Sequence, residues 1–197
     1  MKVKIIEREC LLDDFFRVDA ARLQYEKFDG TLSEPVRRLN LNRGEAVAVL
    51  IYLKDRDSFV LIRQFRFALY EAGREGWIDE IVAGVLDKKG ESPQECAKRE
   101  AIEEAGYEIK ELEPIGTIFV SPGITTERVH LFIGYCTSED KKFAGGGLDA
   151  EHEDIKIVEW DRETAKRKLM NKEIEDGKTV LALQHFFLTE LWRNGNQ

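Results

Sequence analysis

The sequence has few of the residues that cross-link or anchor a protein. Its three cysteines are widely spaced, odd in number and form no CxxC motif, which predicts reduced thiols in a cytoplasmic protein. No apolar run approaches the ~20 residues of a membrane helix. The start, MKVKIIEREC, carries charges throughout and has no uninterrupted apolar stretch, so we expect neither a signal peptide nor a membrane span.

Positive charge is also scarce. The chain has 30 lysines and arginines against 38 aspartates and glutamates, which gives a formal net charge of -8. This balance argues against binding to nucleic acid or to an anionic membrane surface. A protein of this charge would need bridging cations to handle a phosphate substrate.

The composition is that of a globular protein. Of the 197 residues, 43% are hydrophobic and 35% are charged, which is typical of a soluble protein with a core of its own. The length predicts one domain, or one domain with a small appendage.

The N-terminal part of the chain reads as short strands. Extended segments at 2–8 and 15–28 lead to a turn at Asp29–Gly30, which is a hairpin signal, and residues 33–41 form another extended piece. Gly44 marks a possible boundary. We therefore predict a small antiparallel β domain over residues 1–42, and a second domain over residues 43–197.

The second domain mixes strands with a few helices. Apolar, β-branched runs predict strands at 46–53, 58–67, 76–86, 115–120, 127–136 and 154–160. Apolar faces near the end of the chain predict helices at 161–172 and 178–193. This mixture predicts an α/β or α+β domain with a mixed sheet.

A further helix has clear start and stop signals. Ser92 can cap it, Pro93 suits its first turn, and Glu95 completes a capping box. Gly106 is a natural terminator after Ala105. We predict a helix over residues 93–105.

This helix carries glutamates at spacings that local stability does not favour. Glu100 and Glu104 are four residues apart, and Glu100 and Glu103 are three apart, so their carboxylates are neighbours that repel by a few tenths of a kcal/mol. Arg99 relieves part of the repulsion by pairing with Glu103. The plain alternative is a solvated, glutamate-rich helix face.

Three features favour a site over a solvated face. A strand that runs into a glycine-containing loop precedes the helix, and alanines at 97, 101 and 105 allow its other side to press on a sheet. A second acidic group, DAEHED at 149–154, follows the glycine-rich segment 144–147. Clustered carboxylates with few histidines or thiols suit hard cations, Mg²⁺ or Mn²⁺, which neutralise phosphate and activate water.

The pattern as a whole resembles a known motif. Gly84, Glu91 and REAIEEAGY at 99–107 are similar to the Nudix box, G-x5-E-x7-R-E-U-x-E-E-x-G-U, in which U is apolar. The match is complete from Glu91 onward. The sequence departs from the box at one place, where six residues instead of five separate Gly84 from Glu91, and we interpret this as one extra residue in the loop 86–90.

The resemblance extends over most of the chain, to the ADP-ribose pyrophosphatase branch of the family and its relatives that hydrolyse GDP-mannose. It implies a Nudix α/β/α sandwich, an N-terminal β domain and a homodimer. It also implies Mg²⁺-dependent hydrolysis of a nucleoside diphosphate sugar to a nucleoside monophosphate and a sugar phosphate. The similar segments are at 32–50, 60–70, 80–84, 121–128, 144–155 and 177–184.

The resemblance assigns metal ligands in and near the box. It implies that Glu100 and Glu104 are the main ligands, that Glu103 assists them, and that the backbone carbonyl of Ala83 also binds metal. Arg99 belongs to the catalytic group by orienting Glu103 or Glu91.

The general base is implied to lie on the late acidic loop. Glu151 matches the base and Glu153 matches a further metal ligand. His152 is an alternative base, because its unperturbed pKa is close to neutral. Either glutamate is alternatively an ordinary surface residue.

Substrate contacts are implied at five positions, which are Arg66, Glu80, Ser121, Glu127 and Arg38. An arginine fits a diphosphate through forked hydrogen bonds. For Arg66, a structural salt bridge is an equal alternative. In the loop 121–128, Ile124 stands where the family commonly has glycine, which leaves the sugar contacts there open.

Other residues have weaker functional signals. Phe15, Phe16 or Arg37 could contact a nucleobase or phosphate, although ordinary strand roles are the stronger interpretation. We expect His130 to be structural, and Trp77 and Trp192 to serve packing or an interface.

Three functions remain open at this point. The first is a pyrophosphatase of nucleoside diphosphate sugars, with ADP-ribose the first expectation and GDP-mannose the alternative. The second is a Nudix activity on nucleoside triphosphates or dinucleoside polyphosphates, which the N-terminal extension disfavours. The third is a non-catalytic nucleotide-sugar sensor, which the intact box disfavours.

Overall fold

The computed structural model describes residues 1–147 and 154–195, and the chain forms two compact units. Unit 1 contains Met1–Glu45 together with Ile118–Val129. Unit 2 contains Ala46–Thr117 and His130–Gln197. The predicted division at residues 42 and 43 stays a prediction.

Unit 1 is built on a three-stranded antiparallel sheet, as predicted. Its strands are β1 (Val3–Asp13), β2 (Arg17–Tyr25) and β3 (Val36–Asn42), joined in that order. The 118–129 segment belongs here because it bonds to the end of β3. Leu41 donates its N–H to the carbonyl of Ile124 at 2.8 Å and accepts the N–H of Thr126 at 3.1 Å.

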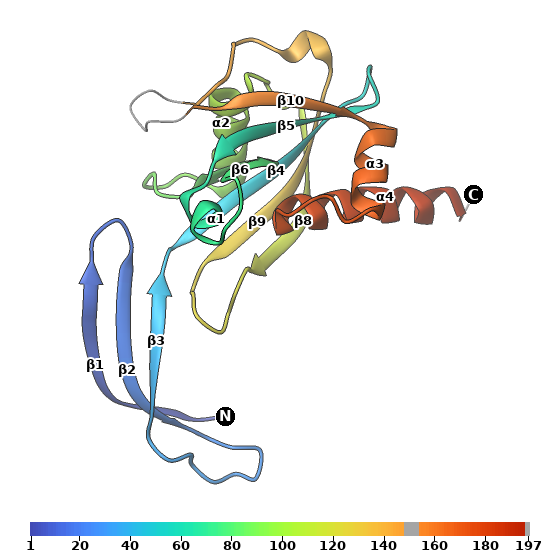
Figure 1. The fold of residues 1–197 in the computed structure, drawn as a ribbon. Coiled ribbons are helices and arrows are strands. Elements are labelled where there is room, and N and C mark those ends of the chain that lie inside the picture. The colour runs from blue at the N-terminus through green and yellow to red at the C-terminus, as the bar shows by residue number, and fades with distance from the viewer. Residues whose placement is uncertain (148–153, 196–197) are drawn as a thin grey trace. The chain divides into compact units, whose positions relative to one another are not determined.

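Unit 2 is built on a seven-stranded sheet (Figure 1). The main path through it runs in the order β10-β5-β4-β9-β8, while β6 pairs with β5 and β7 with β4. The strands are β4 (Glu45–Leu53), β5 (Ser58–Phe65), β6 (Trp77–Glu80), β7 (Val82–Val85), β8 (Glu111–Phe119), β9 (Arg128–Cys136) and β10 (Lys156–Asp161).

The sheet is mixed, as predicted, because β4 and β9 run parallel. At their starts the N–H of Arg128 bonds to the carbonyl of Gly44 at 3.3 Å, and at their ends the N–H of Lys54 bonds to the carbonyl of Cys136 at 2.9 Å. The pairs β4–β5, β5–β10, β5–β6 and β4–β7 are all antiparallel.

The predicted single strand at 76–86 is wrong in one respect. The segment forms two strands, because the chain pairs first with β5, where Glu80 faces Ile62, and then with β4, where Val82 faces Val49. Ile81, fully buried, lies at the crossing. The strand predicted at 58–67 ends at Phe65, and a short helix that was not predicted, α1 (Phe67–Glu71), follows it.

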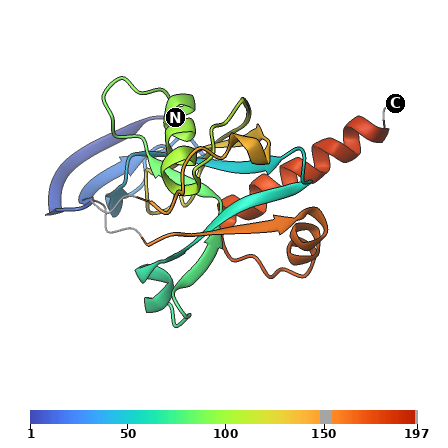
Figure 2. The ribbon, with the colours of Figure 1, turned by 90° about the horizontal axis from the view of Figure 1, so that it is seen from above.

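Helices cover both faces of this sheet (Figure 2). Helix α2 (Pro93–Ala105) packs its alanines on one face, against the core formed by Val47, Val49 and Ile62. Helices α3 (Arg162–Met170) and α4 (Gly177–Gly195) lie on the other face, where the ring of Phe59 packs edge-on to that of Phe186 at 5.0 Å. The result is the predicted α/β/α arrangement.

The ends of α2 are those that the sequence predicts. The Ser92 hydroxyl accepts the N–H of Glu95, the Glu95 carboxylate accepts the N–H of Ser92, and Pro93 begins the helix. Gly106 ends it in the left-handed conformation, with φ of 79°. Both ends of the helix that bears the glutamates are therefore fixed by its own sequence.

No helix in the described parts of the chain combines the length and the apolar character needed to cross a membrane.

Candidate active site

The candidate site lies where α2 packs on β7. Glu100 lies directly over Gly84, and a Cβ atom at that glycine would overlap the Glu100 carboxylate. The close approach explains why a glycine stands here. The placement of the extra residue in the loop 86–90 stays a prediction.

Glu104 is the most buried of the box glutamates. It is 2% exposed, and its carboxylate accepts the N–H of Ala83 at 3.1 Å. A carboxylate is rarely buried unless its charge is compensated. Glu100 and Glu104, four residues apart on α2, thus both direct their carboxylates to the backbone of Ala83 and Gly84.

Arg99 holds three carboxylates together beside this pair. Its guanidinium forms a forked pair with Glu91 at 2.8 and 3.1 Å, and also bonds to Glu100 at 2.7 Å and Glu103 at 2.8 Å. The hydrogen bond from Arg99 lowers the pKa of Glu91, and the bond to Glu91 is the main reason that the pKa of Arg99 is raised. The predicted pair between Arg99 and Glu103 is therefore present.

The cluster keeps an excess of negative charge. Four carboxylates, including that of Glu104, stand against the cations Arg99 and Lys88, whose ammonium lies 3.9 Å from Glu103. Counted over these named residues alone, the formal excess of two negative charges equals the charge of one divalent cation, and oxygen donors are those that Mg²⁺ and Mn²⁺ prefer. The donor set therefore fits the predicted metal.

The described residues do not complete a metal site alone. Within residues 1–147 and 154–195, no group of three or more His, Cys, Asp or Glu side chains is arranged to hold an ion. The predicted base Glu151, its alternative His152 and the predicted ligand Glu153 lie outside the described residues.

A second charged network surrounds Glu80, which is 3% exposed. Arg66 donates to one of its carboxylate oxygens at 2.7 Å, and Lys178 donates to the other at 3.1 Å. Lys178 also bonds to Asp176 at 2.6 Å. Burial opposes the ammonium charge, but the carboxylates of Glu80 and Asp176 outweigh it and raise the pKa of Lys178.

The structure thus joins the two predicted residues Arg66 and Glu80, and adds Lys178, which sequence reasoning missed. Its segment, GKTVLALQ, resembles the family, but nothing in the spacing shows that the start of α4 reaches β6. Thr179 confirms that contact, because its hydroxyl accepts the N–H of Ile81 at 2.9 Å.

Gln64 lies near the end of β5, just before Arg66 of this network. It is 6% exposed. Among the described residues, its buried side-chain nitrogen Nε2 has no hydrogen-bond partner. Buried polar groups are normally satisfied. Within the part of the chain that the structure describes, one amide donor is therefore unused two residues before Arg66.

The other predicted substrate residues belong to unit 1. The guanidinium of Arg38 bonds to the carbonyl of Arg37 at 3.2 Å, and Glu127 lies 3.8 Å from the Arg43 guanidinium. The Ser121 carbonyl accepts the N–H of Ile124 at 3.0 Å, which closes a turn that a β-branched residue accommodates.

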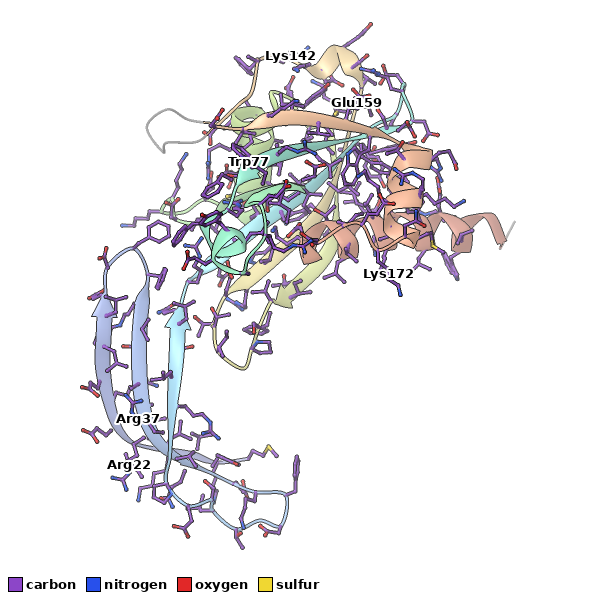
Figure 3. The ribbon with its side chains drawn as sticks, viewed as in Figure 1. Arg22, Arg37, Trp77, Lys142, Glu159 and Lys172 are labelled. Atoms are coloured by element: carbon purple, nitrogen blue, oxygen red, sulfur yellow. The ribbon has the colours of Figure 1, made fainter. Side chains whose placement is uncertain are left out.

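Unit 1 also places like charges together. Arg22 and Arg37 face each other directly across β2 and β3, and both are labelled in Figure 3. Like charges at opposed positions of a sheet are destabilising. Glu7 of β1 faces Arg22 from the other side, so a carboxylate accompanies the two arginines in this row of the sheet.

The residues predicted to be structural have packing contacts. His130 Nδ1 lies 2.9 Å from the hydroxyl of Thr117. The ring of Trp77 packs edge-on to that of Phe65 at 5.9 Å, although the residue is 51% exposed. Trp192 is 72% exposed near the end of α4.

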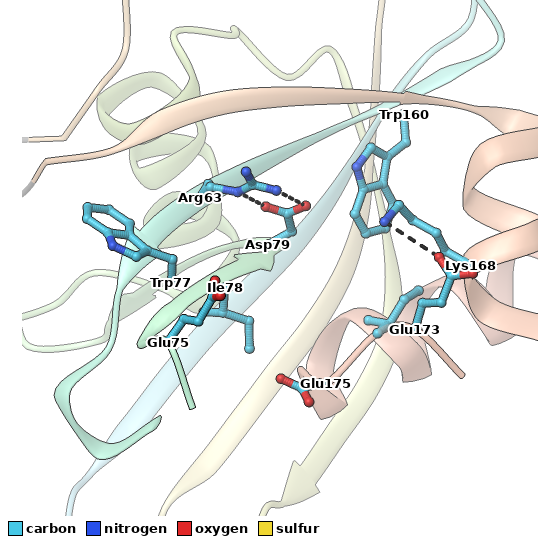
Figure 4. A pocket seen from close by; sticks show the side chains of 10 residues that line it. Arg63, Glu75, Trp77, Ile78, Asp79, Trp160, Lys168, Glu173 and Glu175 are labelled. Atoms are coloured by element: carbon cyan, nitrogen blue, oxygen red, sulfur yellow. Dashed lines mark hydrogen bonds and ion pairs between the residues drawn. The ribbon is translucent and has the colours of Figure 1, made fainter. Parts of the chain in front are cut away.

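A cavity of about 270 Å³ lies on the face of the sheet that α3 covers (Figure 4). Ion pairs line its walls, with Arg63 bonded to Asp79 and Lys168 placed 3.8 Å from Glu173 and 5.0 Å from the Trp160 ring. The box glutamates lie on the other face of the sheet, so this cavity is separate from the candidate site.

Known proteins resemble this chain in sequence and fold. Residues 42–183 match the NUDIX domain family. The chain is 39% identical over 184 residues to the ADP-ribose pyrophosphatase of Escherichia coli (strain K12). The matched region covers 92% of this chain and 86% of that protein. The chain is 35% identical over 191 residues to the GDP-mannose pyrophosphatase of Citrobacter koseri, which covers 96% of this chain and 97% of that protein.

A solved structure gives the same fold. The crystal structure of an ADP compounds hydrolase has a TM-score of 0.72 to this chain and covers 100% of this chain and 96% of that chain. The sequence identity is 22%, so this likeness shows the fold alone.

We expect the Gly84→Ala variant to fold and to lose metal-dependent function. The new methyl group meets the flexible side chain of Glu100, which can rotate away while the backbone stays in place. Half-saturation by Mg²⁺ should rise about 10-fold or more, as for other residues that orient a ligand. A titration of activity with Mg²⁺ measures it, and Gly177→Ala, where a Cβ meets nothing within 4 Å, is the matched control. Equal Mg²⁺ requirements in the two variants would contradict the placement of Glu100.

We also expect acid to destabilise the protein through the Arg99 cluster. The pKa of Glu91 is lowered in the folded state, so the pair contributes stability above the ordinary glutamate pKa of 4.5 and loses it as the pH falls below that value. Urea unfolding between about pH 3 and pH 6 measures the slope. In Arg99→Met the slope should be shallower, and Glu91→Gln should reduce it similarly. An unchanged slope in both variants would refute this account.

Proposed function

Because this chain belongs to the Nudix family as a pyrophosphatase, we propose that it hydrolyses the pyrophosphate bond of a nucleoside diphosphate sugar. ADP-ribose is the first substrate, with AMP and ribose 5-phosphate as products. The observation that supports this proposal most strongly is the pair Glu100 and Glu104, which are four residues apart on one helix. Their carboxylates both lie at the backbone of Ala83 and Gly84, within a cluster of excess negative charge.

We propose that the metal is Mg²⁺, with Mn²⁺ able to replace it. Glu100 and Glu104 would hold it, with the carbonyl of Ala83 and the carboxylate of Glu153 as further ligands. A divalent cation supplies charge neutralisation of the diphosphate and lowers the pKa of water.

The protein's own groups then hold and move protons. Glu151, or His152 in its place, takes a proton from the attacking water as the water oxygen bonds to one phosphorus and the bridging P–O bond breaks. Arg99 keeps Glu103 and Glu100 in place, because one guanidinium bonds to both. Helix packing fixes these groups before substrate binds, and such preorganisation is a principal source of catalysis.

Recognition of the diphosphate is proposed for the network around Glu80. Arg66 and Lys178 offer two cations at one buried carboxylate, and an arginine fork suits phosphate oxygens. From unit 1 we propose contacts by Arg38, Ser121 and Glu127.

The relatives support the proposed order of the two candidate substrates. The E. coli relative named an ADP-ribose pyrophosphatase is 39% identical, and the C. koseri relative named a GDP-mannose pyrophosphatase is 35% identical. ADP-ribose is therefore the proposal and GDP-mannose the second candidate. A non-catalytic sensor of nucleotide sugars is the alternative of another class.

A substrate panel tests this function. Incubated with ADP-ribose, GDP-mannose and related sugars, the chain should release nucleoside monophosphate only when Mg²⁺ is present, fastest from ADP-ribose. Glu104→Gln should lower turnover by more than about 100-fold, beyond the range for residues that only support a ligand. The exposed Glu108→Gln, just after the same helix, is the control. A chain that binds these sugars but hydrolyses none of them is a sensor.

The proposed assembly is a homodimer built through residues 1–42. All eleven residues of β1 are exposed, and this edge strand bears the apolar side chains of Ile5, Ile6, Leu11 and Leu12. A three-stranded sheet needs a covered apolar face, and an open edge invites pairing. A second copy of the chain would supply the cover.

Light scattering tests the dimer. We expect twice the chain mass in solution, and Ile6→Lys should shift the protein toward the monomer. Leu188→Lys, on an exposed residue of α4, should leave the mass unchanged. A monomeric mass for the unaltered chain at about 50 μM, far above the dissociation constant of a stable interface, would overturn the proposal.

A further inference from the structure

The segment 143–147 packs onto the end of α2 with almost no space between the two backbones. A Cβ atom at Gly145 would lie 2.7 Å from the carbonyl oxygen of Glu104 and 2.7 Å from the carbonyl carbon of Ala105. A Cβ at Gly106 would likewise overlap the backbone of Phe143. These are backbone atoms, which cannot rotate away as a side chain can.

Hydrogen bonds hold the two backbones together. Gly146 donates its N–H to the carbonyl of Glu104 at 2.8 Å, and Gly147 donates to the carbonyl of Glu103 at 3.2 Å. The last carbonyls of a helix have no partner within the helix and must find one elsewhere. Here the partners come from a segment about forty residues later in the chain.

Gly146 also connects this contact to β10. Its carbonyl accepts the N–H of Ile155 at 3.3 Å. The stretch that ends at Gly147 lies before the acidic segment, and the stretch that begins with Asp154 lies after it. The bond between Gly146 and Ile155 therefore joins these two stretches. Gly146 is also bonded to Glu104, so one glycine joins the box helix to both stretches.

Glu104 is consequently held at two points. Its carboxylate accepts the N–H of Ala83 from β7, and its carbonyl accepts the N–H of Gly146. A shift of the 143–147 segment would move the backbone of the two residues that carry neighbouring carboxylates.

The backbone of this segment is one that side chains disfavour. The φ angles of Gly145, Gly146 and Gly147 are 70°, 109° and 85°. Three successive residues in this region are accessible to glycine and strained for any other residue. The glycines are therefore needed both for conformation and for close approach.

We propose that Gly145 and Gly146 are positioning residues that fix the carboxylates of Glu103 and Glu104 for binding a divalent cation. The inference rests on the proposed function, since it gives the helix end a role in metal binding. A helix cap alone would change the stability of the protein and leave its metal affinity as it is. Metal affinity measured apart from stability separates the two roles.

The test compares Mn²⁺ binding to the whole chain, followed by electron paramagnetic resonance without substrate, in Gly145→Ala and Gly73→Ala. Gly73 has a similar φ of 78° and no atom within 4 Å of an added Cβ, so it carries the conformational cost without the close approach. Gly145→Ala should bind Mn²⁺ about 10-fold or more weakly than Gly73→Ala, the loss typical of residues that orient metal ligands. Thermal unfolding of both variants shows how much stability each has lost.

If Gly145→Ala does not fold, Gly146→Ala decides by the same comparison. A Cβ there has 3.7 Å to its nearest neighbour, and its φ of 109° strains the residue that donates to Glu104. The inference is overturned if the Mn²⁺ affinity of the folded variant is within about twofold of that of Gly73→Ala, because this is well below the effect of a ligand-orienting residue. It is also overturned if the unaltered chain binds no Mn²⁺. Failure of the unaltered, Mn²⁺-binding chain to hydrolyse any nucleotide sugar would overturn only the proposed function.

Discussion

The structure depends on keeping four carboxylates close together on and beside one helix. Glu100, Glu103 and Glu104 occupy adjacent positions of α2, and Arg99 draws Glu91 onto them from the preceding loop. Their mutual repulsion would loosen an isolated helix. The capping box, the alanine face buried on the sheet and the glycine contacts at both 84 and 106 counter this tendency. The fold thus keeps these carboxylates close together, in an arrangement that a bound cation would stabilise.

Much of this arrangement was predictable because its signals are local. Ser92, Pro93, Glu95 and Gly106 set the bounds of α2 from sequence alone, and those bounds are observed. The i,i+4 relation of Arg99 and Glu103 is equally local and is also observed. The antiparallel N-terminal β domain was predicted from extended segments and a turn, and the mixed second sheet from the mixture of strands with helices.

What escaped prediction depends on contacts between distant residues. The break at Ile81 arises because the chain changes partner strand there, and a run of apolar residues carries no sign of the change. Lys178 meets Glu80 across about a hundred positions of sequence, so no spacing indicates the pair. The membership of residues 118–129 in unit 1 likewise rests on bonds to Leu41.

The Glu80 network balances two cations, Arg66 and Lys178, with the two carboxylates of Glu80 and Asp176. Glu80 holds both cations at hydrogen-bond distance, and Asp176 also bonds to Lys178. If this network binds a diphosphate as proposed, the diphosphate would compete with Glu80 for these donors, and its net affinity would be the difference between two charge-assisted interactions. Such a balance favours a substrate bound firmly enough to be oriented and products that can leave. Among residues 1–147 and 154–195, the buried Nε2 of Gln64 is a further donor without a hydrogen-bond partner.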